Sequence, residues 1–290
     1  KRAFYRAAMG IGLPHRPWGM LTGVRPGKLM TPLLAQGLND AQAARQFERQ
    51  YDVSPARADL VVRTAHATLR AMESLGSKDV CLYVGIPFCP TRCAYCSFVS
   101  QSVEKSMALV PEFLQALARE IAATAEAVRK AGLRVVSLYI GGGTPTTLSA
   151  RQLDALCTQL AAAFDLSALR EFTVEAGRPD TVTEEKLAVL VSHGVNRVSV
   201  NPQTMSDAVL EEIGRHHTAA QVREAVAMVK KFPQLAFNMD LIAGLPADTA
   251  DGFAESLRQV MALGPSNITV HTLALKKGAD LFQRRVVLPS

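Results

Sequence analysis

Apolar residues recur along this chain in two different patterns, and the change between them falls close to residue 78. Before that point they recur at helical spacing over 28–36, 41–51 and 56–74, which predicts amphipathic helices. Proline and glycine residues interrupt the chain ahead of the first of these segments, as is typical of loops. We therefore expect residues 1–77 to form an N-terminal extension of helices and loops.

From residue 80 onward, short runs typical of strands alternate with amphipathic helical segments. The predicted strands are 81–86, 135–140, 171–175, 197–201, 236–242 and 268–272, and the predicted helices between them are 110–131, 150–164, 184–193, 219–231 and 253–263. This alternation is typical of parallel βα units. Repeated right-handed connections form either a barrel or a doubly wound sheet, and both bind ligands at the carboxyl ends of the strands.

Three cysteines follow the first predicted strand in a CxxxCxxC loop: Cys89, Cys93 and Cys96. A structural zinc site takes a fourth soft ligand, but Cys81 falls in the strand and Cys157 in a distant helix, where buried, inert thiols are expected. Iron–sulfur clusters normally take four thiolates, so three leave one iron open. We predict a [4Fe–4S] cluster whose open iron binds S-adenosylmethionine (SAM), passes it an electron and releases a 5′-deoxyadenosyl radical.

The cysteine spacing, with Tyr95 before the last cysteine, resembles the radical SAM superfamily. Other segments resemble, in chain order, the oxygen-independent coproporphyrinogen III oxidase (dehydrogenase) family, namely Tyr83, 86–89, 141–145, Gln203, 214–218 and 240–246. The segments 22–26, 174–179 and 201–204 resemble the branch of that family with an extra N-terminal region. The resemblance implies an α/β fold, a partial six-stranded (β/α)6 radical SAM barrel over residues 78–290, with a C-terminal substrate-side region missing.

A glycine-rich segment after the second predicted strand contains Gly142, Gly143 and Thr144. Taken alone, such a segment is equally well explained as a tight turn that uses positive φ. Beside the cysteine loop it resembles the family element that accepts the amino group of SAM. The resemblance therefore assigns these three residues to the cofactor.

Several polar residues lie at the later strands. Taken singly, each is explained as a structural residue whose hydrogen bonds are satisfied within the protein. Glu175 ends the third predicted strand, Gln203 follows the fourth, Arg215 falls in the next helix and Asp240 lies inside the fifth. A carboxylate inside an apolar strand is costly to bury without a donor, so Asp240 is expected to have one. The resemblance assigns these residues to SAM together with Tyr83, Tyr95 and Ala274, and it makes Tyr83 and the three cysteines the catalytic set.

The composition narrows the expected partners. The 290 residues carry 32 Lys and Arg against 26 Asp and Glu, a formal charge of +6, and their dispersal favours an anionic small substrate over nucleic acid. No stretch reaches the apolar length of a membrane span, and five cysteines, an odd number, suit a reducing compartment. We expect a cytoplasmic protein, of which this chain, beginning at Lys1 without methionine, is a piece.

The resemblance implies oxidative decarboxylation of coproporphyrinogen III to protoporphyrinogen IX in haem biosynthesis, with an electron donor such as flavodoxin or ferredoxin. Candidates for contacts with substrate carboxylates are Arg25, Arg92, Arg178, Lys276 and Lys277. Two departures keep the substrate open: Gly85 stands where better-studied members have histidine, and no further cysteine closely follows Cys96. The alternatives are a haem chaperone and a radical SAM methyltransferase.

Overall fold

The computed structural model describes residues 2–22, 25–98 and 100–284. The chain forms two compact units, Lys1–Ser77 and Lys78–Ser290. Two residues of the segment 22–26, Gly23 and Val24, lie outside the described residues. Among the described helices, none combines the length and the apolar character that crossing a lipid bilayer requires.

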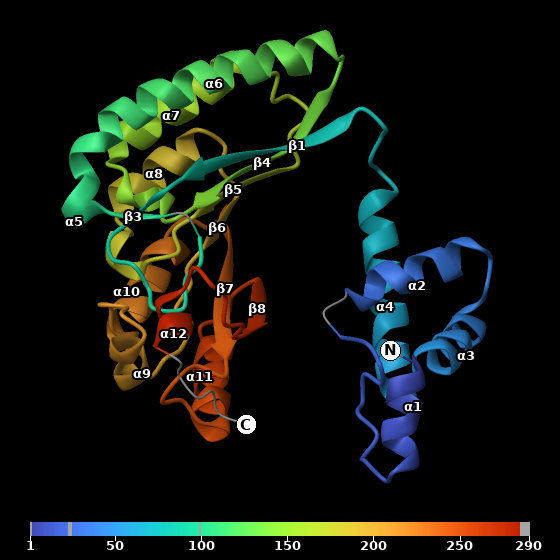
Figure 1. Ribbon diagram of the computed structural model, residues 1–290. Coiled ribbons are helices and arrows are strands. Elements are labelled where there is room, and N and C mark those ends of the chain that lie inside the picture. The colour runs from blue at the N-terminus through green and yellow to red at the C-terminus, as the bar shows by residue number, and fades with distance from the viewer. Residues whose placement is uncertain (1, 23–24, 99, 285–290) are drawn as a thin grey trace. The chain divides into compact units, whose positions relative to one another are not determined.

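The first unit is helical (Figure 1). Its described helices are α1 (Arg2–Gly10), α2 (Pro26–Ala35), α3 (Asp40–Tyr51) and α4 (Pro55–Met72). The last three match the predicted segments, and Met30, Phe47 and Val61 are buried in the small core between them. The sequence analysis did not predict α1, a short helix that buries no residue.

The second unit is built on one sheet whose strands are all parallel. The strands are β1 (Asp79–Ile86), β4 (Arg134–Gly142), β5 (Glu171–Glu175), β6 (Arg197–Ser199), β7 (Ala236–Ala243) and β8 (Asn267–Thr272), in the order β1-β4-β5-β6-β7-β8. No described strand closes the gap between β1 and β8, so the sheet is an open barrel. The predicted α/β fold with a partial six-stranded (β/α)6 barrel is confirmed.

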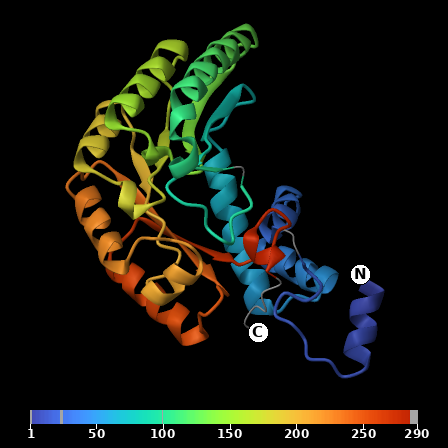
Figure 2. The ribbon, with the colours of Figure 1, turned by 60° about the vertical axis from the view of Figure 1, so that its left-hand side comes forward.

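One long helix follows most strands and returns the chain along the outside of the sheet, and together these helices form a curved outer row (Figure 2). They are α6 (Val110–Lys130), α7 (Ala150–Ala163), α8 (Glu184–Ser192), α10 (Ala219–Lys230) and α11 (Ala250–Ala262). Capping boxes set two of their starts, at Ser149 and Thr218, because the cap side chains satisfy amides that lack an intrahelical partner. All five match predicted helices within a few residues.

Short elements that the sequence did not indicate fill the connections. They are β2 (Phe88–Cys89), β3 (Gln101–Ser102), α5 (Val103–Ser106), α9 (Asp207–Glu212), α12 (Asp280–Gln283) and the 3-10 turns Met107–Leu109, Pro145–Thr147 and Pro179–Thr181. Each is too short to show a hydrophobic period.

The two faces of the sheet differ in chemistry. Side chains directed at the helices are apolar and buried, as at Leu138, Ile140 and Phe172. Alternate positions on the same strands are polar and line a cavity on the inner side, as at Tyr139 and Asp240. Because strand side chains alternate between faces, one set of residues builds the core while the other builds the site.

Three predictions about local structure are wrong. Arg215 lies in the loop between α9 and α10 and not in a helix, because α9 ends at Glu212 and Gly214 takes a positive φ of 72°. The fourth strand ends at Ser199, because Pro202 lacks an amide donor and interrupts the pairing with β7, which resumes only as an isolated bridge at Gln203. Cys81 is exposed and not buried, whereas Cys157 is buried as expected.

Candidate functional site

A cavity of about 570 Å³ lies on the inner side of the sheet, at the carboxyl ends of its strands. Every predicted site residue except Tyr83 lines it, namely Cys89, Cys93, Tyr95, Cys96, Gly142, Gly143, Thr144, Glu175, Gln203, Arg215, Asp240 and Ala274. The structure therefore brings these residues together from the cysteine loop, from three strands (β4, β5 and β7) and from the connections after β4, β6 and β8.

Backbone contacts hold the cysteine loop against the rest of the barrel. The Cys96 amide donates to the Cys93 carbonyl (3.0 Å), which closes a turn between two of the cysteines. The Ala94 amide donates to the Ile213 carbonyl (2.9 Å), and the Ala94 carbonyl accepts from the Leu281 amide (2.9 Å). The loop is thus fixed from both sides by segments more than a hundred residues away in the chain.

The thiols of the loop are only partly accessible. Burial raises the pKa of the Cys89 thiol, and the Thr144 hydroxyl, which donates to its Sγ (3.6 Å), partly offsets that rise. Burial also raises the pKa of Cys96. A thiol with a raised pKa stays protonated at neutral pH unless a metal, as a strong local positive charge, removes the proton.

The donor set fits a cluster better than a single ion. Among the described residues, no three His, Cys, Asp or Glu side chains are placed to bind one metal ion together. A cluster needs no such convergence, because each thiolate binds a different iron of the group. Three cysteines that line the same cavity could therefore hold a [4Fe–4S] cluster and would leave one of its irons without a protein thiolate.

The glycine turn after β4 packs against the start of the cysteine loop. A Cβ on Gly143 would lie 2.6 Å from the Phe88 carbonyl oxygen and 2.9 Å from the Cys89 Sγ, both closer than real Cβ contacts allow. Gly142 has φ +112°, which L side chains rarely adopt. The absence of a side chain at these glycines thus lets the cysteine loop pack closely against the turn, and it also leaves space for a ligand.

Two carboxylates line the cavity, and each accepts a neutral donor. The Tyr139 hydroxyl donates to Glu175 Oε1 (2.5 Å), and the Asn238 amide donates to Asp240 Oδ1 (2.6 Å), which is the donor that the sequence analysis expected. Burial raises the pKa of Glu175, and the Asp240 charge adds to the rise. Among the described residues, His271 Nε2 lies 3.9 Å from Asp240 Oδ2 and no Lys or Arg pairs with either acid, so both carboxylates could accept hydrogen bonds from a ligand.

A row of polar side chains after β5 and β6 has unsatisfied hydrogen-bonding atoms. Ser199 Oγ, Asn201 Oδ1 and Gln203 Oε1 are buried without a partner and their residues line the cavity. Gln203 also takes φ +70°, a strained conformation of the kind that clusters at ligand sites. Buried polar atoms need partners, and the amino group, ribose hydroxyls and adenine nitrogens of SAM offer them.

Arg215 joins the cysteine loop to two other connections. Its Nη atoms donate to the carbonyls of Gly177 (2.7 Å) and Asn201 (2.6 Å), to the Tyr95 hydroxyl (3.1 Å) and to Cys93 Sγ (3.8 Å). Burial raises the pKa of Tyr95, so its hydroxyl stays neutral. The buried Nε of Arg215 has no partner, and this atom is the one free for a ligand.

Tyr83 is the predicted site residue that the cavity does not include. Its side chain is 64% exposed and stacks on Tyr139 with ring centroids 5.8 Å apart. Tyr83 therefore contacts Tyr139, which lines the cavity, but does not line the cavity itself. Of the residues proposed for substrate carboxylates, Arg178 and Lys276 line the cavity.

Sequence reasoning missed several residues that line the cavity. They include Tyr139, Arg197, Ser199, Asn201, Asn238 and His271. For Asn238 the signal is the strand period, because Asn238 stands two residues before the assigned Asp240. Alternate residues share a face, so one assigned residue on a strand points to its neighbours at i±2.

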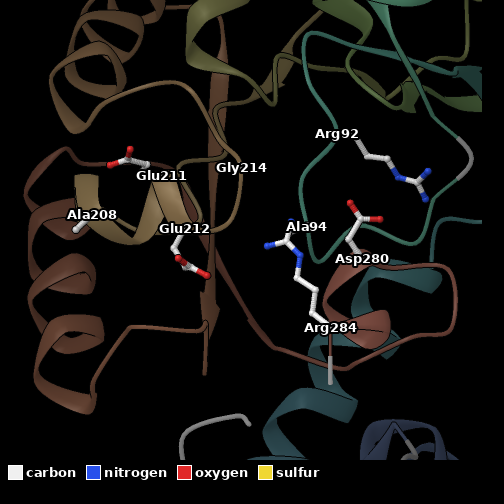
Figure 3. Close-up of a pocket in the computed structure, with 8 residues that line it drawn as sticks. All are labelled: Arg92, Ala94, Ala208, Glu211, Glu212, Gly214, Asp280 and Arg284. Carbon is white, nitrogen blue, oxygen red and sulfur yellow. The ribbon is translucent and has the colours of Figure 1, made fainter. Parts of the chain in front are cut away.

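A second pocket lies behind the cysteine loop (Figure 3). Arg92, Asp280 and Arg284 stand on one side of it and Glu211 and Glu212 on the other. The Arg92 guanidinium donates to the Gly278 carbonyl (2.8 Å). None of the three cysteines lines this pocket, so it is separate from the cavity that the sulfurs share.

Known proteins resemble this chain in sequence and in fold. The chain is 38% identical to the oxygen-independent coproporphyrinogen-III oxidase-like protein HemZ of Bacillus subtilis, over 92% of this chain and 54% of HemZ. It is 35% identical to the heme chaperone HemW of Lactococcus lactis, over 70% of this chain and 51% of HemW. The chain thus spans about half the length of the curated relatives it matches.

The solved structure of coproporphyrinogen III oxidase (HemN) from Escherichia coli superimposes with a TM-score of 0.66 at 29% identity, over 78% of this chain and 52% of HemN. The family model of the radical SAM superfamily matches residues 83–260, more than half of the chain. The chain therefore belongs to the radical SAM superfamily, whose cofactors are a [4Fe–4S] cluster and SAM.

Proposed function

We propose that Cys89, Cys93 and Cys96 bind the [4Fe–4S] cluster and that SAM binds in the adjoining cavity. When bound, the two cofactors supply a one-electron reductive cleavage that gives a 5′-deoxyadenosyl radical, which can take hydrogen from unactivated carbon. The observation that carries the proposal is the meeting of three cysteines with buried, unpartnered polar atoms around one cavity.

The roles of the other residues follow from their contacts. Thr144 positions Cys89 through its hydroxyl, and Gly142 and Gly143 bring a bare backbone to the cofactor. Glu175 and Asp240 accept from the ribose or amino group, while Gln203, beside them, bonds the nucleoside part. Arg215 and Tyr95 hold the loop, Ala274 lines the cavity and would contact SAM, and Tyr83 stacks on Tyr139 beside the cavity.

The substrate that this site supports best is coproporphyrinogen III. Each of two propionate side chains would lose a hydrogen atom to the 5′-deoxyadenosyl radical, and then carbon dioxide and one electron, which passes to an external one-electron acceptor. The two propionates become vinyl groups, giving protoporphyrinogen IX. The cavity offers cations for the remaining carboxylates at Arg197 and Lys276, and anionic groups pair well with a planar guanidinium. The similarity to HemZ and HemN supports this choice. A flavodoxin or ferredoxin in the cytoplasm would supply the electron.

Turnover of the whole protein tests the proposal. The reconstituted full-length protein is incubated without oxygen with SAM, dithionite and coproporphyrinogen III, and porphyrins and nucleosides are analysed by mass spectrometry. We expect vinyl products in step with 5′-deoxyadenosine. 5′-Deoxyadenosine without vinyl products would refute the decarboxylase assignment alone, and the absence of both would refute the radical assignment.

The second candidate is a haem chaperone, which the 35% identity to HemW favours. The same preparation distinguishes the two. A chaperone binds haem stoichiometrically and leaves coproporphyrinogen III unchanged, whereas the proposed enzyme converts it. Haem titration by absorbance, run beside the turnover assay, gives the comparison.

A further inference from the structure

Arg178 is a buried cation that the proposed function leaves unused. It follows β5 in the chain, its residue is 2% exposed, and its Nε donates to Asp180 Oδ1 (3.1 Å). Its Nη1 donates to the Thr91 hydroxyl (3.0 Å) on the cysteine loop and lies 4.0 Å from Cys93 Sγ. Arg178 is therefore inside the site and cannot act as a solvated surface charge.

The contacts of Arg178 are incomplete for a buried charge. Its Nη2 atom is buried and has no partner, and the Asp180 carboxylate pairs with only the Nε edge. A buried charge is costly unless it is paired and hydrogen-bonded. The Nη1 atom of the same guanidinium faces Cys93 Sγ, so negative charge at that sulfur would compensate part of the buried charge.

A second buried cation reaches the same sulfur. Arg215 Nη1 lies 3.8 Å from Cys93 Sγ, and Arg215 is 5% exposed. Cys93 is itself 9% exposed, so little water screens these contacts and electrostatic interactions there are strong. Two guanidinium groups thus converge on one cysteine, from two different connections of the barrel.

We propose that Arg178, with Arg215, sets the reduction potential of the cluster by donating N–H···S hydrogen bonds to Cys93. The inference rests on the proposed binding of the cluster by the three cysteines. A cluster with three thiolates is anionic and gains one more negative charge when it accepts an electron from a low-potential one-electron donor. Cations and hydrogen bonds at its sulfurs stabilise that reduced form, so Arg178 is a positioning residue that makes reduction easier.

The potential is measured directly. Arg178→Met keeps the length of the side chain and removes the charge and the donors. In titrations of the anaerobic holoprotein followed by electron paramagnetic resonance, we expect the ratio of reduced to oxidised cluster at a fixed potential to fall about tenfold, a shift of about 59 mV to more negative potential for one electron. Arg178→Lys keeps the charge but not the planar fork, so its shift should have the same sign and be smaller.

Thr91→Val is the matched control, because it removes the other loop contact of Arg178 and leaves the shape of the residue. Its potential should stay at the wild-type value. An unchanged potential in Arg178→Met, or an equal shift in Thr91→Val, would overturn the proposal. If Arg178→Met loses iron, the potential of Arg178→Lys is used instead: a shift to more negative potential supports the proposal, and an unchanged potential overturns it. Loss of the cluster from the wild type itself would instead overturn the proposed function.

Discussion

Cys89, Cys93 and Cys96 have different surroundings although they share one short loop. Cys93 is buried between two guanidinium groups, whereas Cys89 accepts from the Thr144 hydroxyl. Their spacing was readable from the sequence, because ligands of one centre must stand close together in the chain. The groups that surround the cysteines could not be predicted from the sequence, because Thr144, Arg178 and Arg215 come from connections far along the chain.

Replacement of one cysteine should remove the cluster. We expect Cys93→Ala to lose the visible iron–sulfur absorption and most of its iron and sulfide after anaerobic reconstitution, because two thiolates hold a cluster poorly. Cys157→Ala is the control: its thiol is buried in α7 and burial raises its pKa to about 12, so it takes no part. Full iron and sulfide in Cys93→Ala would contradict the assignment of the ligands.

At the scale of elements, the site is formed where the ends of parallel strands and their connections pack together. The turn after β4 contacts the cysteine loop after β1, and the two strands are neighbours in register, with Gly85 opposite Gly141. The sequence predicted both segments and their place at strand ends. It did not show that Gly143 is needed for the approach of Cys89, because that contact depends on the packing of two loops.

A methyl group at this contact should disturb the loop. We expect Gly143→Ala to destabilise the protein by about 1–3 kcal/mol, the usual cost of overpacking, and to lower its iron content. Gly85→Ala is the control, because its added Cβ meets only the Tyr83 ring at 3.4 Å. Iron analysis and urea unfolding of both variants test this, and an iron content in Gly143→Ala equal to that of the control would count against it.

At the scale of the molecule, the two faces of the sheet in the 78–290 unit have different roles: the helix-facing side stabilises the fold and the inner side forms the site. The helix side is apolar and continuous, from Leu138 to Phe172 and Val198. The inner side is polar and holds unsatisfied atoms. Burial of apolar surface drives folding. The apolar contacts on the helix-facing side can therefore offset the free-energy cost of the unsatisfied polar atoms on the inner side when no ligand is bound.

Truncation of an apolar side chain on the helix-facing side should therefore lower the free energy of unfolding strongly. Leu138 is fully buried in β4, and we expect Leu138→Ala to lower the free energy of unfolding by about 2–5 kcal/mol. Met261 lies in α11 and is 61% exposed, so Met261→Ala should change it by no more than about 0.5 kcal/mol. Urea unfolding followed by circular dichroism compares them, and equal effects would show that the core is assigned wrongly.

The sequence by itself determined the strands, the long helices and the cysteine ligand spacing, because hydrophobic period and close spacing are local properties of the chain. It also indicated that polar residues gather at the strand ends, since parallel strands share that edge. Only the tertiary structure decided that Arg178 and Arg215 face one sulfur, that Arg215 stands in a loop and that Tyr139 meets Glu175. These contacts depend on how neighbouring strands and their connections pack together, and no short segment of the chain encodes them.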